Sequence, residues 1–353
     1  MAALSQSKKT LINKARTLGS GNDRVYLDTA CCCYLAAVII SDLGLETEFP
    51  EFTFPVDAFF EADESALLDK KGVDLMTILE RLFRLNDDAD TYFSCLASLH
   101  KRRVRYQRIL RQQAIPTMEQ VGPRGLLQFG SLSPRALASL LYWRKWIYDT
   151  DNRAAQQTGY LFEPIIASSI GGSPYSEKRS PIRRSTNKNK GRQVDCILDN
   201  TAYEFKIRIT IAASGQGRWG EELQFPADCK ASGYKPILVV LDPTENDKLT
   251  ALQDAFAAVG GESYVGEDAW KHLDSQAGDT MTMFLEKYVR GPIDDLLKNA
   301  PSELPDITFR QRTDEIEICI GKEKHVIPRE SQNEYDDDDV LPDDVDEELP
   351  GLD

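Results

Sequence analysis

The sequence predicts an α/β protein in which a mainly helical N-terminal region precedes a core of strands flanked by helices. Through most of the first 150 residues, apolar residues recur at intervals of three and four, the period of an amphipathic helix. Beyond residue 190, short apolar runs indicate strands, and helix-like segments separate them. Helices that alternate with strands in this way predict an α/β core.

Four segments of the N-terminal region have helical patterns: "ACCCYLAAVII" (30–40), "ESALLDKKGVDLMTILERLFRL" (64–85), "LHKRRVRYQRILRQQ" (99–113) and "SPRALASLLYWRKWIYD" (133–149). The first is shorter than the ~20 residues that span a bilayer, so it indicates a buried helix and no membrane partner. Ser133 before Pro134 is a typical helix start. The third segment carries six basic residues.

The next part of the chain joins a helix to a basic loop. "RAAQQTGYLFEPIIASSIGG" (153–172) predicts a helix that contains Glu163 and ends at its two glycines. "SEKRSPIRRSTNKNKGR" (176–192) is polar and has seven Lys or Arg, which predicts a mobile basic loop.

The remaining core elements follow in the order strand, strand, helix, strand, helix. They are "VDCIL" (194–198), "YEFKIRITI" (203–211), "WGEELQFPADCKASG" (219–233), "KPILVVLD" (235–242) and "ENDKLTALQDAFAAVG" (245–260). The third strand is continuously apolar, which is typical of a strand buried on both faces.

The C-terminal part consists of two segments that differ in composition. "DITFRQR" and "EIEICIGKEKHVIP" predict a small β-rich addition over residues 301–333. Residues 334–353 contain eleven acidic residues and no Lys or Arg, which predicts a disordered tail. Such a tail could serve as a solubility spacer, or its negative charge could mimic that of a nucleic acid. The formal net charge of −15 lies mostly in this tail, which leaves about −4 for the rest.

Cysteine usage and the N-terminus point to the cytoplasm. The seven cysteines form no CxxC pair and no zinc-ligand spacing, which is typical of buried thiols in a reducing compartment. The N-terminus shows no secretory signal pattern.

The stretch "DCILDNTAYEFK" (195–206) carries the strongest functional signal. Strand alternation puts Glu204, Lys206 and Arg208 on one face of the second strand. With Asp199-Asn200 as a two-residue turn, Asp195 faces Glu204 across a hairpin. Two opposed carboxylates destabilise a hairpin unless a cation neutralises them, and hard oxygen ligands with open positions suit Mg²⁺. Lys206 could then orient a water or stabilise charge on phosphorus.

The alternative is an ordinary solvated hairpin in which basic side chains balance the acids. A short acid, acid and lysine pattern arises easily by chance, and Asp69-Lys70-Lys71 and Asp228-Cys229-Lys230 match its second half. Both of these chance matches fall in segments with helical patterns. The strand context and the basic loop upstream favour a site at residues 195–206.

These residues resemble the PD-(D/E)XK nuclease signature, with Asp195, Glu204 and Lys206 at the motif positions, although Val194 stands where that signature has proline. The resemblance implies a restriction-endonuclease-like mixed sheet flanked by helices, and a further catalytic glutamate, for which Glu163 is the candidate. "PTMEQVGPRGLLQFG" (116–130) and residues 141–172 are similar to the ApaLI-like restriction enzymes.

Several expectations follow from this resemblance. They are a Mg²⁺-dependent type II restriction endonuclease, a double-stranded DNA substrate with a short palindromic site, a homodimer, a cognate DNA methyltransferase and a prokaryotic cytoplasm. Residues 1–150 would serve DNA recognition or dimerisation and residues 151–300 catalysis.

Clustered basic side chains are expected to contact DNA, because phosphate neutralisation needs local positive charge. The candidates lie in the basic loop, around the second strand and in the segment 99–113: Arg183, Arg184, Lys188, Lys190, Arg192, Arg208, Gln216, Arg218, Arg102 and Arg105. For each, the alternative is a solvated position.

Two other functions stay open at this stage. One is a repair, recombination or transposon nuclease of the same fold that recognises DNA structure. The other is a DNA-binding module without catalysis, which the complete acid, acid and lysine set disfavours.

Overall fold

The computed structural model describes residues 5–21, 24–51, 59–60, 74–208 and 216–330. The chain divides into two compact units, each made of separate stretches of sequence. Of the described residues, those up to 101 and those within 160–293 form the first unit, and those within 102–159 and 294–330 form the second. The division into functional domains at residues 150, 300 and 333 stays a prediction.

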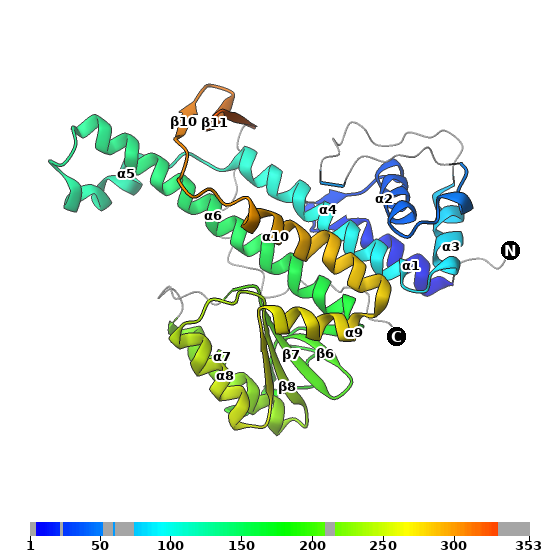
Figure 1. The fold of residues 1–353 in the computed structure, drawn as a ribbon. Coiled ribbons are helices and arrows are strands. Elements are labelled where there is room, and N and C mark those ends of the chain that lie inside the picture. Colours follow the sequence, from blue (N-terminus) through cyan, green and yellow to red (C-terminus); the bar gives the residue numbers. More distant parts are fainter. Residues whose placement is uncertain (1–4, 22–23, 52–58, 61–73, 209–215, 331–353) are drawn as a thin grey trace. The chain divides into compact units, whose positions relative to one another are not determined.

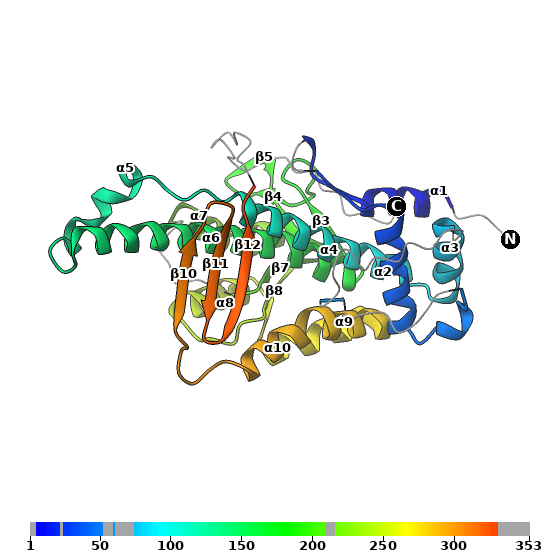
Figure 2. The ribbon, with the colours of Figure 1, turned by 90° about the horizontal axis from the view of Figure 1, so that it is seen from above.

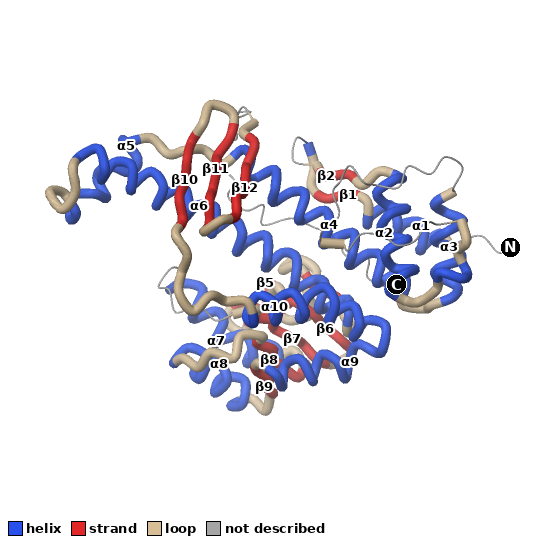
Figure 3. Tube along the Cα trace, turned by 45° about the horizontal axis from the view of Figure 1, so that its top comes forward, coloured by secondary structure: helices blue, strands red, loops and turns tan. Residues whose placement is uncertain are grey.

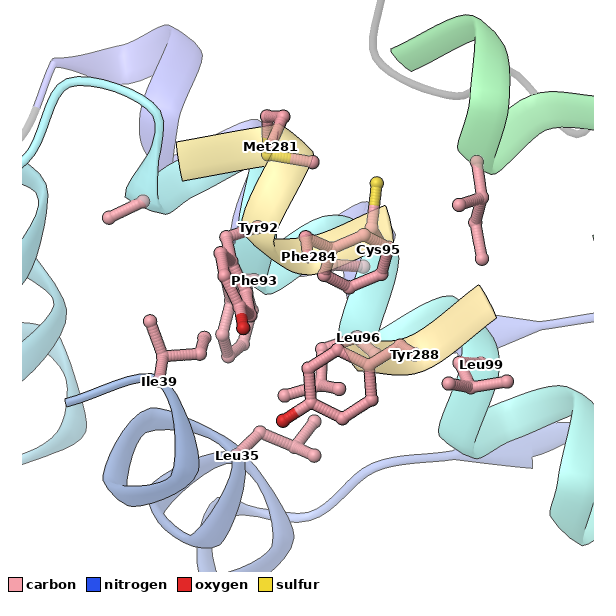
Figure 4. Packing of buried hydrophobic residues seen from close by; sticks show 14 of the residues in the cluster. Leu35, Ile39, Tyr92, Phe93, Cys95, Leu96, Leu99, Met281, Phe284 and Tyr288 are labelled. Carbon is pink, nitrogen blue, oxygen red and sulfur yellow. The ribbon is translucent and has the colours of Figure 1, made fainter. Parts of the chain in front are cut away.

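The first unit begins with helices packed around one apolar core. They are α1 (Gln6–Ala15), α2 (Thr29–Asp42), α3 (Leu75–Leu85) and the start of α4 (Ala89–Gln112), with a short pairing of β1 (Thr17–Leu18) and β2 (Val25–Tyr26) and a 3₁₀ turn, η2 (Glu46–Glu48). As expected for residues 30–40, α2 is buried almost throughout, and Asp28 caps its first turn. Figure 4 shows Leu35 and Ile39 of α2 in the same cluster as Tyr92, Phe93 and Phe284.

A mixed five-stranded sheet forms the centre of the first unit. Its order is β3-β6-β7-β8-β9, with bounds Ser173–Tyr175, Val194–Leu198, Thr201–Lys206, Lys235–Val240 and Glu262–Val265. β3, β6 and β7 pair antiparallel, and β7, β8 and β9 pair parallel. The predicted mixed sheet is therefore confirmed, while β3 and β9 were not predicted.

Helices cover both faces of this sheet (Figure 1). Leu161 and Ile165 of α6 (Pro134–Ser169) and Leu273 of α9 (Glu267–Leu285) share a buried cluster with Phe205 and Val239. On the other face, α7 (Gln216–Ala231) and α8 (Asp247–Ala258) pack against Ala202, Leu238 and Val240. β8 is buried from its second residue onward, as the continuous apolar run predicted.

The second unit contains a helical part and a small sheet. The short α5 (Met118–Val121) and the 3₁₀ helix η4 (Gly122–Gln128) lead into the first half of α6. After the π-helical turn η5 (Glu286–Arg290), α10 (Gly291–Lys298) leads to β10 (Ile307–Gln311), β11 (Glu315–Ile320) and β12 (Glu323–Pro328). These three strands form an antiparallel sheet (Figure 2), which confirms the predicted β-rich addition.

Several predicted boundaries were wrong. The helices predicted at 133–149 and 153–172 are one helix of 36 residues, with Pro164 inside it and Ser133 capping its start. The expected mobile loop 176–192 contains the paired strands β4 (Arg183–Arg184) and β5 (Asn187–Gly191), with Ile182 fully buried. The second core strand ends at Lys206, not Ile211.

Other expectations fall on residues that are not described. They include the start of the helix predicted at 64–85, the chance match to the motif at 69–71 and the acidic tail. The chance match at 228–230 lies in α7 and is helical as expected. Among the described helices, none combines the length and the apolar character needed to cross a membrane.

Candidate active site

A tight turn fixes the register of the hairpin that carries the motif. Asp199 has φ 51°, a left-handed conformation that Asp and Asn adopt more readily than most residues and that two-residue hairpin turns require. Leu198 pairs with Thr201, and Cys196 with Tyr203. The turn and this register are as predicted, and Asp195 and Glu204 are the next residues along the two strands, just beyond the last paired positions.

Asp195 is held by the backbone of the strand opposite. The backbone N–H of Phe205 donates a hydrogen bond to Asp195 Oδ2 at 2.9 Å. The paired positions of β6 and β7 end at Cys196 and Tyr203, so this carboxylate satisfies an amide beyond the ladder. The bond fixes one carboxylate oxygen at the end of the hairpin.

Lys206 lies between two carboxylates. Its Nζ is 2.7 Å from Glu204 Oε1, two residues earlier on the same strand face, and 3.9 Å from Glu222 Oε1 on α7. The Glu204 and Lys206 side chains are only 16% and 24% exposed, so solvent screens this pairing less than it would a surface pair. The motif residues are therefore half-buried beneath α7 rather than on a solvated face.

Glu163, the fourth predicted catalytic residue, lies on α6. Burial raises the pKa of Glu163 to about 7, with Lys206 lowering it and Glu204 raising it further. The charges of Lys206 and Glu204 therefore act on Glu163, although about 40 residues of sequence separate it from them. The structure pairs Lys206 with Glu204 and bonds Asp195 to the same strand, while half-buried Glu163 interacts with Lys206 and Glu204 electrostatically.

The group holds more negative charge than its one lysine balances. Burial raises the pKa of Asp195 well above its usual range, and the carboxylates of Glu204 and Glu163 raise it further. Burial alone would lower the pKa of Lys206, but Glu204, Asp195 and Glu222 outweigh burial and raise it. Lys206 therefore stays protonated at neutral pH, while Asp195 and Glu163 are destabilised in their charged forms.

A divalent cation fits the chemistry of this group. The donors are carboxylate oxygens, which Mg²⁺ prefers, and a cation would relieve the charge that raises the pKa of Asp195. In the described part of the chain, however, no three Asp, Glu, His or Cys side chains converge as a ready set of metal ligands. Here the Lys206 ammonium is the cation in contact with Glu204.

The predicted DNA-contacting residues have different environments. Arg183, Lys188, Lys190 and Arg208 are exposed. Arg184 is half-buried and donates to Glu221 Oε1 on α7 at 2.7 Å. Arg102 and Arg105 on α4 are also half-buried, and Arg102 donates to Gln157 at 3.2 Å. The side chains of Gln216 and Arg218, at the start of α7, lie outside the described residues.

Arg192 differs from the other basic residues of this region. It is only 7% exposed, and its Nη1 donates to Asp228 Oδ2 at 2.8 Å, where Asp228 is fully buried. A second bond joins its guanidinium to the backbone oxygen of Glu221. This arrangement ties the basic segment to α7 and leaves Arg192 little surface for a phosphate, contrary to the role expected from the sequence.

Glu222 is a neighbour of the candidate site that the sequence interpretation missed. It lies on the α7 segment "WGEELQ", next to Glu221, and contacts Lys206 only because α7 packs over the sheet. The sequence shows two adjacent glutamates in the helix that follows the motif strand. Only the packing of that helix determines that Glu222 is the one that contacts Lys206.

The comparisons with known proteins agree on one family. Residues 60–290, more than half of the chain, match the family model described as ApaLI-like restriction endonuclease. The chain is also similar to the Type II restriction enzyme ApaLI of Acetobacter pasteurianus, with 43% identity over 359 residues that cover 93% of this chain and 94% of the relative. No solved structure matches the chain.

Proposed function

Since the chain belongs to the ApaLI-like restriction endonuclease family, and is thus a site-specific deoxyribonuclease, we propose that it cuts both strands of double-stranded DNA at a short palindromic site with Mg²⁺. The observation that supports the proposed site is the half-buried contact of Lys206 with Glu204, beside an Asp195 carboxylate that the backbone of the same strand holds in place. We further propose that this group belongs to a restriction-endonuclease-like catalytic core.

Asp195 and Glu204 would hold the cation, with Glu163 beside them. Mg²⁺, when bound, would neutralise the carboxylates and polarise a phosphoryl oxygen of the substrate. Asp195 keeps one oxygen in its hydrogen bond with Phe205 N–H, so its other oxygen, Oδ1, is the one free to face the cation. A cation bound there would lower the raised pKa of Asp195.

Lys206 acts as a fixed positive charge and not as a base. Its pKa is raised by the surrounding carboxylates, so it keeps its proton throughout the working pH range. An ammonium at this position can orient the attacking water and stabilise the charge that develops on the phosphate as the P–O bond breaks.

Glu163 is the carboxylate best suited to exchange a proton. A pKa of about 7 lies near neutral pH, where a group can accept a proton from the attacking water and release it again. Arg183, Lys188, Lys190 and Arg208 would neutralise nearby phosphates, because they are exposed. Arg192 would instead hold the basic segment in place.

The test of the reaction is digestion of a sequenced plasmid in Mg²⁺ with the cut ends mapped. A discrete set of fragments whose ends share one symmetric sequence supports the proposal. Cleavage of branched or nicked DNA only would favour a structure-specific nuclease of the same fold. A companion DNA methyltransferase that protects the same sequence, in a prokaryotic cytoplasm, completes the proposed role.

A further inference from the structure

The segment 91–148 is strongly basic in a chain that is acidic overall. It contains ten Lys or Arg and one acidic residue, Glu119, whereas the rest of the chain has 32 basic and 56 acidic residues. Six of the ten basic residues lie on α4, and the other four lie on η4 and the first half of α6. Basic residues clustered along helices are typical of a surface that binds nucleic acid.

The basic residues of α4 are partly committed to contacts within the protein. Lys101 is buried and donates to the backbone oxygen of Thr17 at 2.9 Å. Arg111 forms an ion pair with Glu330 at 3.6 Å. The basic residues of η4 and α6 are therefore the better candidates for binding a ligand.

The arginines of η4 and α6 present their charge to solvent. Arg124, Arg135 and Arg144 are exposed, and no acidic residue lies between positions 120 and 148. Within the described part of the chain, no acidic side chain pairs with Arg124 or Arg135. Arg144 Nη1 donates to Gln128 Oε1 at 3.0 Å, and this neutral amide orients the guanidinium without balancing its charge.

Packing fixes η4 against α6, close to α5 (Figure 3). Val121 of α5 shares a buried cluster with Leu137 and Leu141 of α6. Gly125 of η4 fits closely against this cluster, since a Cβ there would lie 2.8 Å from Leu141 Cδ1. We call residues 122–148 the η4–α6 element. Its arginines are carried on a fixed backbone, which lowers the entropy that a ligand must cost them.

Two large apolar side chains are exposed within the same element. Leu127 and Phe129 are 97% and 73% exposed, and they lie between Arg124 and Arg135 in the sequence. Proteins that contact the minor groove of DNA combine arginines with apolar side chains that they insert between base steps. Duplex DNA therefore suits both kinds of side chain in the η4–α6 element.

The candidate catalytic group cannot supply this attraction itself. Its carboxylates outnumber its one lysine, so without metal it repels the phosphates of DNA. The catalytic residues belong to the first unit, whereas the η4–α6 element belongs to the second. Affinity for the DNA backbone therefore requires basic side chains elsewhere in the chain.

We propose that the η4–α6 element is a DNA-contacting surface separate from the catalytic group. Arg124, Arg135 and Arg144 bind backbone phosphates. Leu127 and Phe129 contact the bases or sugars between these phosphates. The choice of DNA as the partner rests on the family to which the chain belongs, and the choice of surface rests on the charge and exposure of these five residues.

The experiment measures binding of the full chain to a short fluorescent DNA duplex of mixed sequence, in EDTA, over a range of salt concentrations. Combining Arg124→Gln, Arg135→Gln and Arg144→Gln should reduce the slope of log affinity against log salt by about 2.7, since each phosphate contact contributes about 0.9. Affinity near 0.1 M salt should fall at least ~10-fold. Each single variant should reduce the slope by about 0.9, and circular dichroism checks that every variant is folded.

Two further variants separate phosphate contacts from other effects. Lys271→Gln is the matched charge control, because the Lys271 side chain is 67% exposed on α9 of the first unit, and it should bind DNA like the wild type. Phe129→Ser should lower affinity several-fold without changing the salt slope, because it removes an apolar contact and no phosphate contact.

Three results would overturn the proposal. They are an unchanged affinity and salt slope in the triple arginine variant, an equal loss in Lys271→Gln, and binding to anionic phospholipid vesicles that depends on these arginines when DNA binding does not. No measurement requires metal or cleavage. A chain that binds DNA through the η4–α6 element but never cuts it would contradict the proposed function and leave this surface in place.

Discussion

Lys206 Nζ lies 2.7 Å from Glu204 Oε1, on the face of β7 that α7 covers. Both residues belong to a six-residue strand, and their spacing of two puts them on one face without any help from tertiary structure. The contact with Glu222 at 3.9 Å, by contrast, exists only because α7 packs over this face. The strand geometry alone therefore brings Lys206 next to Glu204, whereas tertiary packing brings Glu222 next to Lys206.

Replacing Lys206 should slow cleavage without unfolding the protein. Lys206→Ala removes the cation next to Glu204, and loss of one such electrostatic contribution typically lowers the turnover number by about 10²–10³-fold. The measurement is single-turnover cleavage of a plasmid carrying the site. Lys235→Ala on the neighbouring strand is the control, since Lys235 pairs with Glu262 away from this group. A Lys206→Ala rate within about threefold of wild type would remove Lys206 from the mechanism.

Glu163 should make the metal-free protein less stable as the pH rises. Its pKa is about 7 in the folded protein against a usual 4.5, so the folded state binds the extra proton between these values. The stabilisation is complete below pH ~4.5 and is lost as the pH rises through ~7. Glu163→Gln should abolish this part of the pH dependence, on the order of 1–2 kcal/mol.

Urea unfolding in EDTA at about pH 5.5 and about pH 8 measures this difference. Glu267→Gln is the control, because the Glu267 side chain is 60% exposed. Adding Ca²⁺ should stabilise the wild type more at the higher pH than at the lower, since the cation and the proton compete for the same carboxylates. Parallel pH profiles for wild type and Glu163→Gln would contradict the assigned pKa.

Two basic residues of the segment 176–192 should have opposite phenotypes. Arg192→Met leaves the buried Asp228 carboxylate unpaired, which typically costs about 3–5 kcal/mol of stability. Lys190→Met should leave stability unchanged, weaken DNA binding in Ca²⁺ and lower the salt dependence of binding by about one phosphate contact. Chemical unfolding and fluorescence anisotropy separate the two effects. A stable Arg192→Met with weakened DNA binding would reverse the assignment.

The turn at Asp199 should tolerate glycine and resist a β-branched residue. Its φ of 51° suits glycine, whereas a Val side chain there costs about 1–2 kcal/mol. Asp199→Gly should match the wild type in urea unfolding and in cleavage, and Asp199→Val should be less stable. Equal stability of the two variants would mean that the turn does not hold the register of the hairpin.

The hairpin and its register were predictable because they depend on local chemistry. An Asp-Asn pair favours the turn, and strict alternation then fixes the pairs from Leu198–Thr201 to Cys196–Tyr203. Short strands such as β3 and β9 were missed because "SPY" and "ESYV" carry little alternation, and pairing with a neighbour is what makes them strands. Pro164 lies inside α6, as it does in the helix predicted at 153–172, and Leu161 and Ile165 on either side of it pack into the core.

The burial of Arg192 and the contact between Glu222 and Lys206 could not be predicted from the sequence, and the reason here is different. Both depend on α7 lying across the sheet, where Asp228 meets Arg192 and Glu222 approaches Lys206. The sequence shows these residues as charged positions among many others. Only the packed helix distinguishes a structural arginine from one that can bind phosphate.

The group around Asp195 and Glu204 is the proposed centre of DNA cleavage. The most direct measurement follows Asp195→Asn, which keeps the size and an acceptor for Phe205 N–H but removes the charge. We predict that this variant binds the target site in Ca²⁺ with near-normal affinity and cleaves it at least ~10²-fold more slowly in Mg²⁺. Cleavage at the wild-type rate would contradict the assignment of this group as the catalytic site.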